Sequence, residues 1–151
     1  MLTSTNDNPL YIPFIKGPFK GKGANRVAVR ELVAEMAQIR QAMDQLIATY
    51  NATFARPRLV NLGLIQRRDT YPLMWWRESV GGGPFIQLFQ SERSDRGREL
   101  LRKAGPNTVS ALRDFDRQRL ILNFRSKIVG SALEAFVIYE RGVDELECEV
   151  A

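Results

Sequence analysis

Two stretches of this 151-residue chain repeat apolar side chains every seven residues, and this restricts the fold more than any other feature. In residues 29–50 the repeat consists of Val29, Leu32, Met36, Ile39, Met43, Leu46 and Tyr50. Such spacing puts the apolar groups on one side of a helix that packs lengthwise against another helix. We expect Asn25 to cap this helix and Pro57 to end it after Phe54.

A second long helix is expected after Gly105-Pro106, with Asn107 or Thr108 as its cap. Its apolar stripe consists of Leu112, Phe115, Leu122, Val129, Leu133 and Phe136. The basic residues of its first half are expected to form a solvated face; they are Arg113, Arg117, Arg119, Arg125 and Lys127. Two helices with matching repeats predict an antiparallel pair whose apolar stripes form the core.

Between these helices the pattern becomes β-prone. Residues 59–66 and 71–78 are expected to be strands joined by a turn at 67–70, and Gly81-Gly82-Gly83-Pro84 turns the chain into 85–90. Ser94 is expected to cap a short basic helix that ends near Lys103. The prediction is an α+β fold: two long antiparallel helices with a small two- or three-stranded antiparallel sheet and a short basic helix between them.

We expect three segments: an N-terminal arm with a Gly/Lys loop at 1–24, one α+β domain at 25–141 and an acidic tail at 142–151. The chain is 44% hydrophobic and 26% charged, which is typical of globular proteins. It contains no run of about 18 apolar residues and its N-terminus lacks the order of a signal peptide. With Cys148 as the single cysteine, no internal disulfide can form. We expect a cytoplasmic protein that does not enter a membrane.

The chain contains no histidine, which argues against an enzyme. Histidine is the commonest general base and metal ligand, and it activates serine and cysteine nucleophiles. A zinc or iron–sulfur site needs more ligands than one cysteine supplies. We therefore expect no catalytic residues, no metal site and no cofactor.

The charge is uneven along the chain, with a basic first part and an acidic end. Residues 134–151 contain six acidic residues and one basic residue, whereas residues 1–133 contain 21 basic and 11 acidic residues. Residues 16–23 have the sequence Lys-Gly-Pro-Phe-Lys-Gly-Lys-Gly, in which Lys16, Lys20 and Lys22 lie among three glycines. Backbone N–H groups of such a loop can approach an anion, but the spacing and the missing hydroxyl residue exclude a P-loop. The alternative is a solvated linker.

Adjacent aromatic and basic residues on the second strand suggest a binding face. Trp75 and Trp76 must point to opposite faces, so one is expected in the core and the other beside Arg67, Arg68 and Tyr71. The alternation does not decide between them, and the candidate site takes Trp76 with Arg77 as exposed. Arginines beside an aromatic ring are typical of single-strand binders and of protein-binding hot spots. A further alternative is that both tryptophan rings lie in the core.

Three stretches make the chain resemble an uncharacterised family encoded on bacterial integrating conjugative elements, some members of which are labelled integrase regulator R. They are Pro18–Gly23, Leu73–Arg77 and Arg117–Phe124, the last with the sequence Arg-Gln-Arg-Leu-Ile-Leu-Asn-Phe. The resemblance implies an accessory protein of a mobile element, acting in integrase expression or DNA processing. Asn123 falls in the third stretch, either as a buried hydrogen-bonding residue or as a reader of bases.

Together these features predict a non-enzymatic accessory or regulatory protein of a mobile element that binds DNA or RNA through the phosphate backbone. The expected contacts are Lys16, Lys20, Lys22, Arg67, Arg68, Trp76, Arg77, Arg96 and Arg98. The alternative is a protein-interaction module that inhibits a host complex, for example an anti-CRISPR protein, or that binds an element-encoded complex. A homodimer formed through the helical seam is a third alternative.

Overall fold

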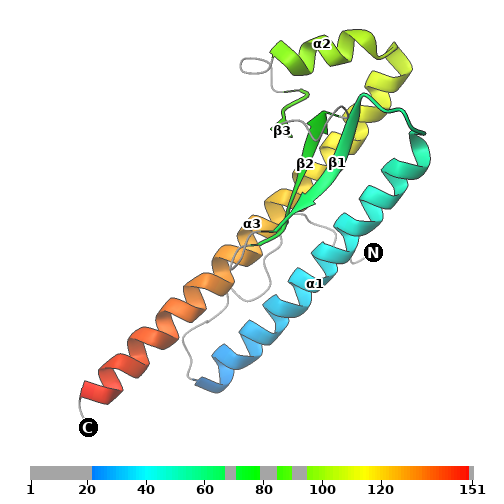
Figure 1. Ribbon diagram of the computed structural model, residues 1–151. Coiled ribbons are helices and arrows are strands. Elements are labelled where there is room, and N and C mark those ends of the chain that lie inside the picture. Colours follow the sequence, from blue (N-terminus) through cyan, green and yellow to red (C-terminus); the bar gives the residue numbers. More distant parts are fainter. Residues whose placement is uncertain (1–21, 67–70, 79–84, 90–94, 150–151) are drawn as a thin grey trace, which may run out of the picture. The chain divides into compact units, whose positions relative to one another are not determined.

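The computed structural model describes residues 22–66, 71–78, 85–89 and 95–149. Within them the element order is α1 (Lys22–Thr53), β1 (Val60–Ile65), β2 (Leu73–Glu78), β3 (Phe85–Ile86), α2 (Asp95–Lys103) and α3 (Pro106–Glu149) (Figure 1). The strands form one antiparallel sheet in the order β1-β2-β3. The α+β fold, with two long antiparallel helices, a small sheet and a short basic helix, is confirmed.

The start of α1 differs from the prediction. The helix begins at Lys22, so Lys22 and Gly23 are helical rather than part of a loop, and Asn25 is not its cap. Asn25 lies three residues before Ala28 and seven before Leu32, and all three are buried. Packing of this continued stripe therefore favours a longer helix, although an internal glycine costs about 1 kcal/mol. The other end agrees, because α1 stops at Thr53, shortly before Pro57.

The start of α3 also differs from the prediction, which placed the cap at Asn107 or Thr108. The helix begins at Pro106, and the Val109 N–H donates to the Gly105 carbonyl at 3.0 Å. Proline suits the first helical position because that residue needs no N–H donor. At the other end α3 continues to Glu149, so residues 142–149 of the expected acidic tail are helical.

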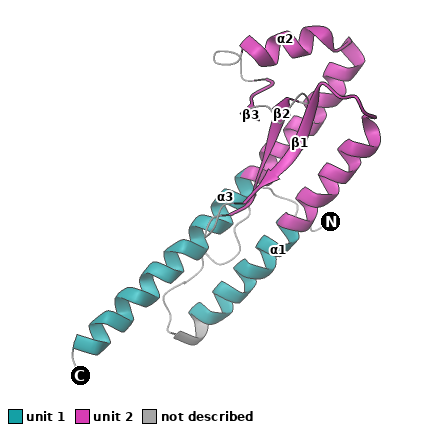
Figure 2. Ribbon diagram, viewed as in Figure 1, with its two compact units in different colours: residues 1–39, 124–151 teal, residues 40–123 magenta. Residues whose placement is uncertain are grey.

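Contacts divide the chain into two compact units (Figure 2). The first unit contains the described residues up to Ile39 and those from Phe124 onward. Its core consists of Ala28, Leu32, Ile39, Val129 and Phe136, all from the predicted helical stripes or beside them. An ion pair joins Glu35 to Arg125 within this unit, and the Ser126 hydroxyl lies 3.7 Å from the Met36 sulfur.

The second unit, Arg40–Asn123, contains the sheet and α2. Aromatic rings from three elements meet at its centre. The Tyr50 ring of α1 lies 5.3 Å from the ring of Trp76 on β2 and 5.3 Å from that of Phe115 on α3, both edge to face. Edge-to-face pairs add to the stability that burial gives, by about 0.5–1.5 kcal/mol each. These three rings pack the sheet against α1 and α3.

Among the described residues, no helix combines the length and the apolar character that a membrane crossing needs.

Candidate nucleic-acid interface on the sheet

The sheet has one buried face and one more open face, on which Arg77 and Phe85 are exposed and the other described side chains are half-buried. In the β1–β2 ladder Leu62 pairs with Trp76, and on the other side Trp76 pairs with Ile86. These side chains share the inner face with Val60 and Met74, and all five are buried. Because side chains alternate along a strand, the residues between them point away from the helices of this unit.

Three side chains of the open face form a contact group, which we call the outer-face cluster: Trp75, Arg77 and Phe85. Arg77 pairs with Phe85 across the β2–β3 ladder. The Arg77 guanidinium carbon lies 4.4 Å from the centre of the Phe85 ring, and the Trp75 ring lies 5.8 Å from it. Phe85 is 43% exposed, Arg77 is exposed and Trp75 is half-buried. A cation held over an aromatic ring beside a second ring is suited to stacking and to binding an anion.

Gly63 lies directly opposite Trp75 in the β1–β2 ladder. A Cβ atom added at Gly63 would have the Trp75 carbonyl oxygen, at 4.0 Å, as its nearest neighbour. Among the described residues, no side chain therefore lies within 4 Å of that Cβ position on the face that Trp75 shares. Glycine within a strand often marks a close approach by a ligand.

The assignment of Trp76 to the binding site is wrong. Trp76 is fully buried, and its indole Nε1–H donates to Asp116 Oδ1 at 2.7 Å. A buried indole needs such an acceptor, and α3 supplies it. The ring on the other face is that of Trp75, which is half-buried; strand alternation alone did not decide between the two.

A buried polar network joins β2 to α3 beneath the cluster. Asp116 Oδ1 also accepts from Arg119 Nε at 2.7 Å, and an Arg119 Nη1–H donates to the Met74 carbonyl at 3.3 Å. Asn123 binds the same strand residue twice: its Oδ1 accepts from the Met74 N–H at 2.7 Å, and its Nδ2 donates to the Met74 carbonyl at 2.9 Å. Asn123 is therefore a structural hydrogen-bonding residue.

The network also corrects the expectation that Arg119 lies on a solvated face, because Arg119 and Asp116 are both buried. Asp116, Arg119 and Asn123 are spaced three and four residues apart and so lie on the same side of α3. Met74 has no partner in β3, a strand of only two residues that pairs with Trp76 and Arg77. The Asn123 amide therefore satisfies both backbone hydrogen-bonding groups of Met74 in place of a longer β3.

The predicted contacts on α2 are engaged with carboxylates. Arg96 donates Nε–H to Glu78 Oε2 at 3.1 Å, donates to Glu78 Oε1 as well, and donates to Glu99 Oε2 at 2.8 Å. The Arg96 hydrogen bond lowers the pKa of Glu78 below its ordinary value, as it does that of Glu99. Arg96 therefore attaches α2 to the end of β2, which is a structural role. Arg98 pairs with Asp95 at 3.0 Å in the open, and such a pair is easily exchanged for a phosphate.

Four of the predicted contacts lie outside the described residues: Lys16, Lys20, Arg67 and Arg68. Lys22 is the first residue of α1. Of the predicted set, the described residues place Arg77 in the outer-face cluster and Arg98 on α2 of the same unit. Phe85 was missed, because its pairing with Arg77 depends on a register across the glycine turn that no local pattern specifies.

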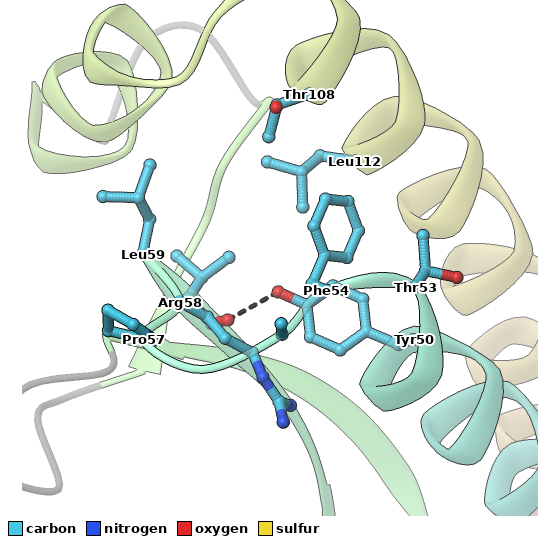
Figure 3. A pocket seen from close by; sticks show the side chains of 10 residues that line it. Tyr50, Thr53, Phe54, Pro57, Arg58, Leu59, Thr108 and Leu112 are labelled. Carbon is cyan, nitrogen blue, oxygen red and sulfur yellow. Dashed lines mark hydrogen bonds between the residues drawn. The ribbon is translucent and has the colours of Figure 1, made fainter.

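A pocket of about 220 Å³ opens near the end of α1 and the start of β1 (Figure 3). Its lining includes Tyr50, Phe54, Leu59 and Leu112. The Tyr50 hydroxyl donates to the Val60 carbonyl at 2.5 Å, so this polar group of the lining already has a partner within the protein. Thr53, Arg58 and Thr108 also line it, so the lining mixes apolar and polar side chains.

Tyr50 provides a test of this packing. Burial raises its pKa to about 12, and the nearby Arg58 charge lowers it by less. The phenol stays protonated in the folded chain after it ionises in the unfolded chain, near pH 10. The free energy of unfolding should therefore fall by up to about 1.4 kcal/mol per pH unit above pH 10. Denaturant titrations between neutral and alkaline pH measure this.

Tyr50→Phe is the control for that experiment. It removes the titrating group and leaves the Val60 carbonyl without its donor. We therefore expect the free energy of unfolding to be lower by about 1–2 kcal/mol at neutral pH and to depend less on pH above pH 10. If the free energy of unfolding of the variant falls above pH 10 as steeply as that of the wild type, another group is responsible for the titration.

Within the described residues, no group of histidine, cysteine, aspartate and glutamate side chains is arranged to hold a metal ion. No family model matches the chain, and neither a curated protein nor a solved structure matches it.

Proposed function

We propose that this protein binds single-stranded nucleic acid without catalysing a reaction, and that the outer-face cluster of Trp75, Arg77 and Phe85 is the contact surface. The observation that carries the proposal is the open sheet face, where the Arg77 guanidinium lies over the Phe85 ring and beside Trp75. Aromatic rings stack on bases of any identity, and arginine binds the phosphates between them.

Single strands suit this face better than a duplex. Bases in a duplex are stacked on one another and cannot lie flat on a protein ring, whereas unpaired bases can. The gap at Gly63 beside Trp75 gives one such base a place next to the ring. Sequence specificity is not part of the proposal, because stacking recognises the π-face that all bases share.

Basic groups of the same unit supply the electrostatic attraction. Arg102 on α2 is exposed, and no ion pair holds it among the described residues. Arg98 is exposed, and its ion-pair partner among the described residues is the fully exposed Asp95. Such groups steer a polyanion to the surface and release counterions when it binds. The whole chain carries a net charge of +5, which favours the same partner.

The test is the binding of a labelled single-stranded oligonucleotide to variants of the cluster. Because each stacked base contributes about 1–3 kcal/mol, Trp75→Ala and Phe85→Ala should each weaken binding by about tenfold or more. Arg77→Ala should weaken binding and reduce its salt dependence. Gly63→Ala, whose Cβ comes no closer than 4.0 Å to any other described residue, should weaken binding while the melting temperature stays near that of the wild type.

Matched controls separate the cluster from general effects. Leu120→Ala removes another exposed apolar side chain of the same unit, and Arg117→Ala removes an exposed arginine of α3. Both should leave affinity within about twofold of the wild type if the cluster is the main contact. Equal losses in cluster and control variants would contradict the assignment of the site.

The resemblance to the conjugative-element family supports a cytoplasmic role as an accessory or regulatory protein of a mobile element. Tryptophan and arginine also dominate protein-binding hot spots. If no nucleic acid binds even at low salt, the same cluster is the docking surface for a host or element-encoded protein.

A further inference from the structure

One side of α3 in the first unit carries exposed apolar side chains along its length. Phe124, Ile138 and Leu146 are 44%, 63% and 65% exposed. Ile128, Ser131 and Ala135 fall between Phe124 and Ile138 at steps of three and four, and Leu146 follows Ile138 by eight residues, about two turns. The six residues therefore form one helical stripe, apolar except for Ser131. We call it the α3 stripe. Such a series of apolar groups in water is typical of an interaction surface.

The α3 stripe is not the side that packs within the unit. Ser126, Val129 and Phe136 are the buried residues of this part of α3, and they lie on the opposite side of the helix. The described residues of α1 use that side, where Glu35 pairs with Arg125. The stripe is thus a second apolar face of the same helix.

The distribution of charge along α3 indicates which partner covers the α3 stripe. Residues 106–127 of α3 contain five basic and two acidic residues, whereas residues 128–149 contain one basic and six acidic residues. A helix whose charge changes sign along its length attracts a second copy of itself in the antiparallel direction and repels one in the parallel direction. The occupant that this pattern selects is therefore another copy of the same chain.

We propose that two copies of the protein associate through an antiparallel pairing of their α3 stripes. This inference is independent of the proposed nucleic-acid binding. Lys127 and Glu134 stand one heptad apart on the same edge of the stripe, and neither forms an ion pair with another described residue. In an antiparallel pair, residues on the same edge face each other, so Lys127 of each copy meets Glu134 of the other.

The same register aligns the apolar groups. When Lys127 faces the second copy's Glu134, the symmetry axis falls near Ser131, and Phe124 faces the second copy's Ile138. Ser131, with its small side chain, lies at the centre, where the two backbones approach most closely. One register therefore brings together both the charged pair and two of the large apolar side chains of the stripe, Phe124 and Ile138.

Sedimentation equilibrium over a range of protein concentrations tests the pairing. The wild type is expected to approach twice its 17.2 kDa mass. Ile138→Glu places a charge in the stripe of both copies and should weaken dimerisation by about 100-fold. Val137→Glu is the matched control, because Val137 is also exposed but lies off the stripe. Circular dichroism verifies that both variants keep their helix content.

The charge pair gives a second readout. Lys127→Glu and Glu134→Lys should each weaken the dimer by about tenfold, because each brings like charges together twice, and the double variant should recover most of the loss. A wild type that stays monomeric, equal losses from Ile138→Glu and Val137→Glu, or a double variant no better than the single ones would overturn the proposal.

Discussion

Replacing Asp116 by alanine is expected to lower the free energy of unfolding by about 3–5 kcal/mol, the usual cost of leaving a buried charge unpaired. Asp116 Oδ1 accepts from both Trp76 Nε1 and Arg119 Nε at 2.7 Å. Its removal leaves a buried guanidinium and a buried indole N–H without their acceptor. Chemical denaturation, with the fluorescence of the buried Trp76 as one probe, measures the loss.

Two further variants make this prediction specific. Asp116→Asn keeps an acceptor oxygen but removes the charge, so its loss should lie between the wild type and Asp116→Ala. Asp114 pairs with Arg117 at 3.9 Å, and both side chains are about 70% exposed, so Asp114→Ala should change stability by less than about 1 kcal/mol. Equal effects of the alanine variants at 114 and 116 would mean that the buried network does not support the sheet.

Asn123→Ala is expected to cost about 2–3 kcal/mol of stability, because it leaves the buried Met74 N–H without a partner. The Met74 carbonyl keeps its hydrogen bond from Arg119, so most of the loss in stability comes from the unpaired Met74 N–H. Asn123→Asp keeps an acceptor for the Met74 N–H but loses the Nδ2 donor. It should lower stability less than Asn123→Ala if the bond to the Met74 N–H contributes most of the stabilisation.

This prediction separates the two roles considered for Asn123. If Asn123 is a structural residue, Asn123→Ala lowers the melting temperature and the folded variant still binds nucleic acid. A normal melting temperature with lost binding would show instead that Asn123 reads bases. Thermal unfolding and oligonucleotide titration of the same preparation decide between them.

The fold could be predicted largely from the sequence because burial imposes a periodic pattern. The stripes around Met43 and Val129 required two helices packed side by side, and the short apolar runs at 59–66 and 71–78 required strands. The ends of the helices were less predictable. Asn25 is a good capping residue, but it lies on the buried stripe with Ala28, and tertiary packing decided its place.

The candidate site could be predicted only in part. Leu73 to Trp76 are all apolar, so alternation shows that the two tryptophans face opposite ways without saying which way. The choice depends on Asp116, a residue forty positions away that accepts the Trp76 indole N–H. Likewise, the spacing of Asp116 and Arg119 is that of an ordinary solvated pair, and only the position of the sheet makes it buried.

The central claim is that single strands bind the outer-face cluster, and fluorescence anisotropy of labelled single-stranded and double-stranded oligonucleotides tests it most directly. We predict tighter binding of the single strand and a fall in affinity of about tenfold or more between about 50 and 200 mM salt, as two or three phosphate contacts require. Stronger binding of the duplex, or no binding of either form at low salt, would contradict the claim.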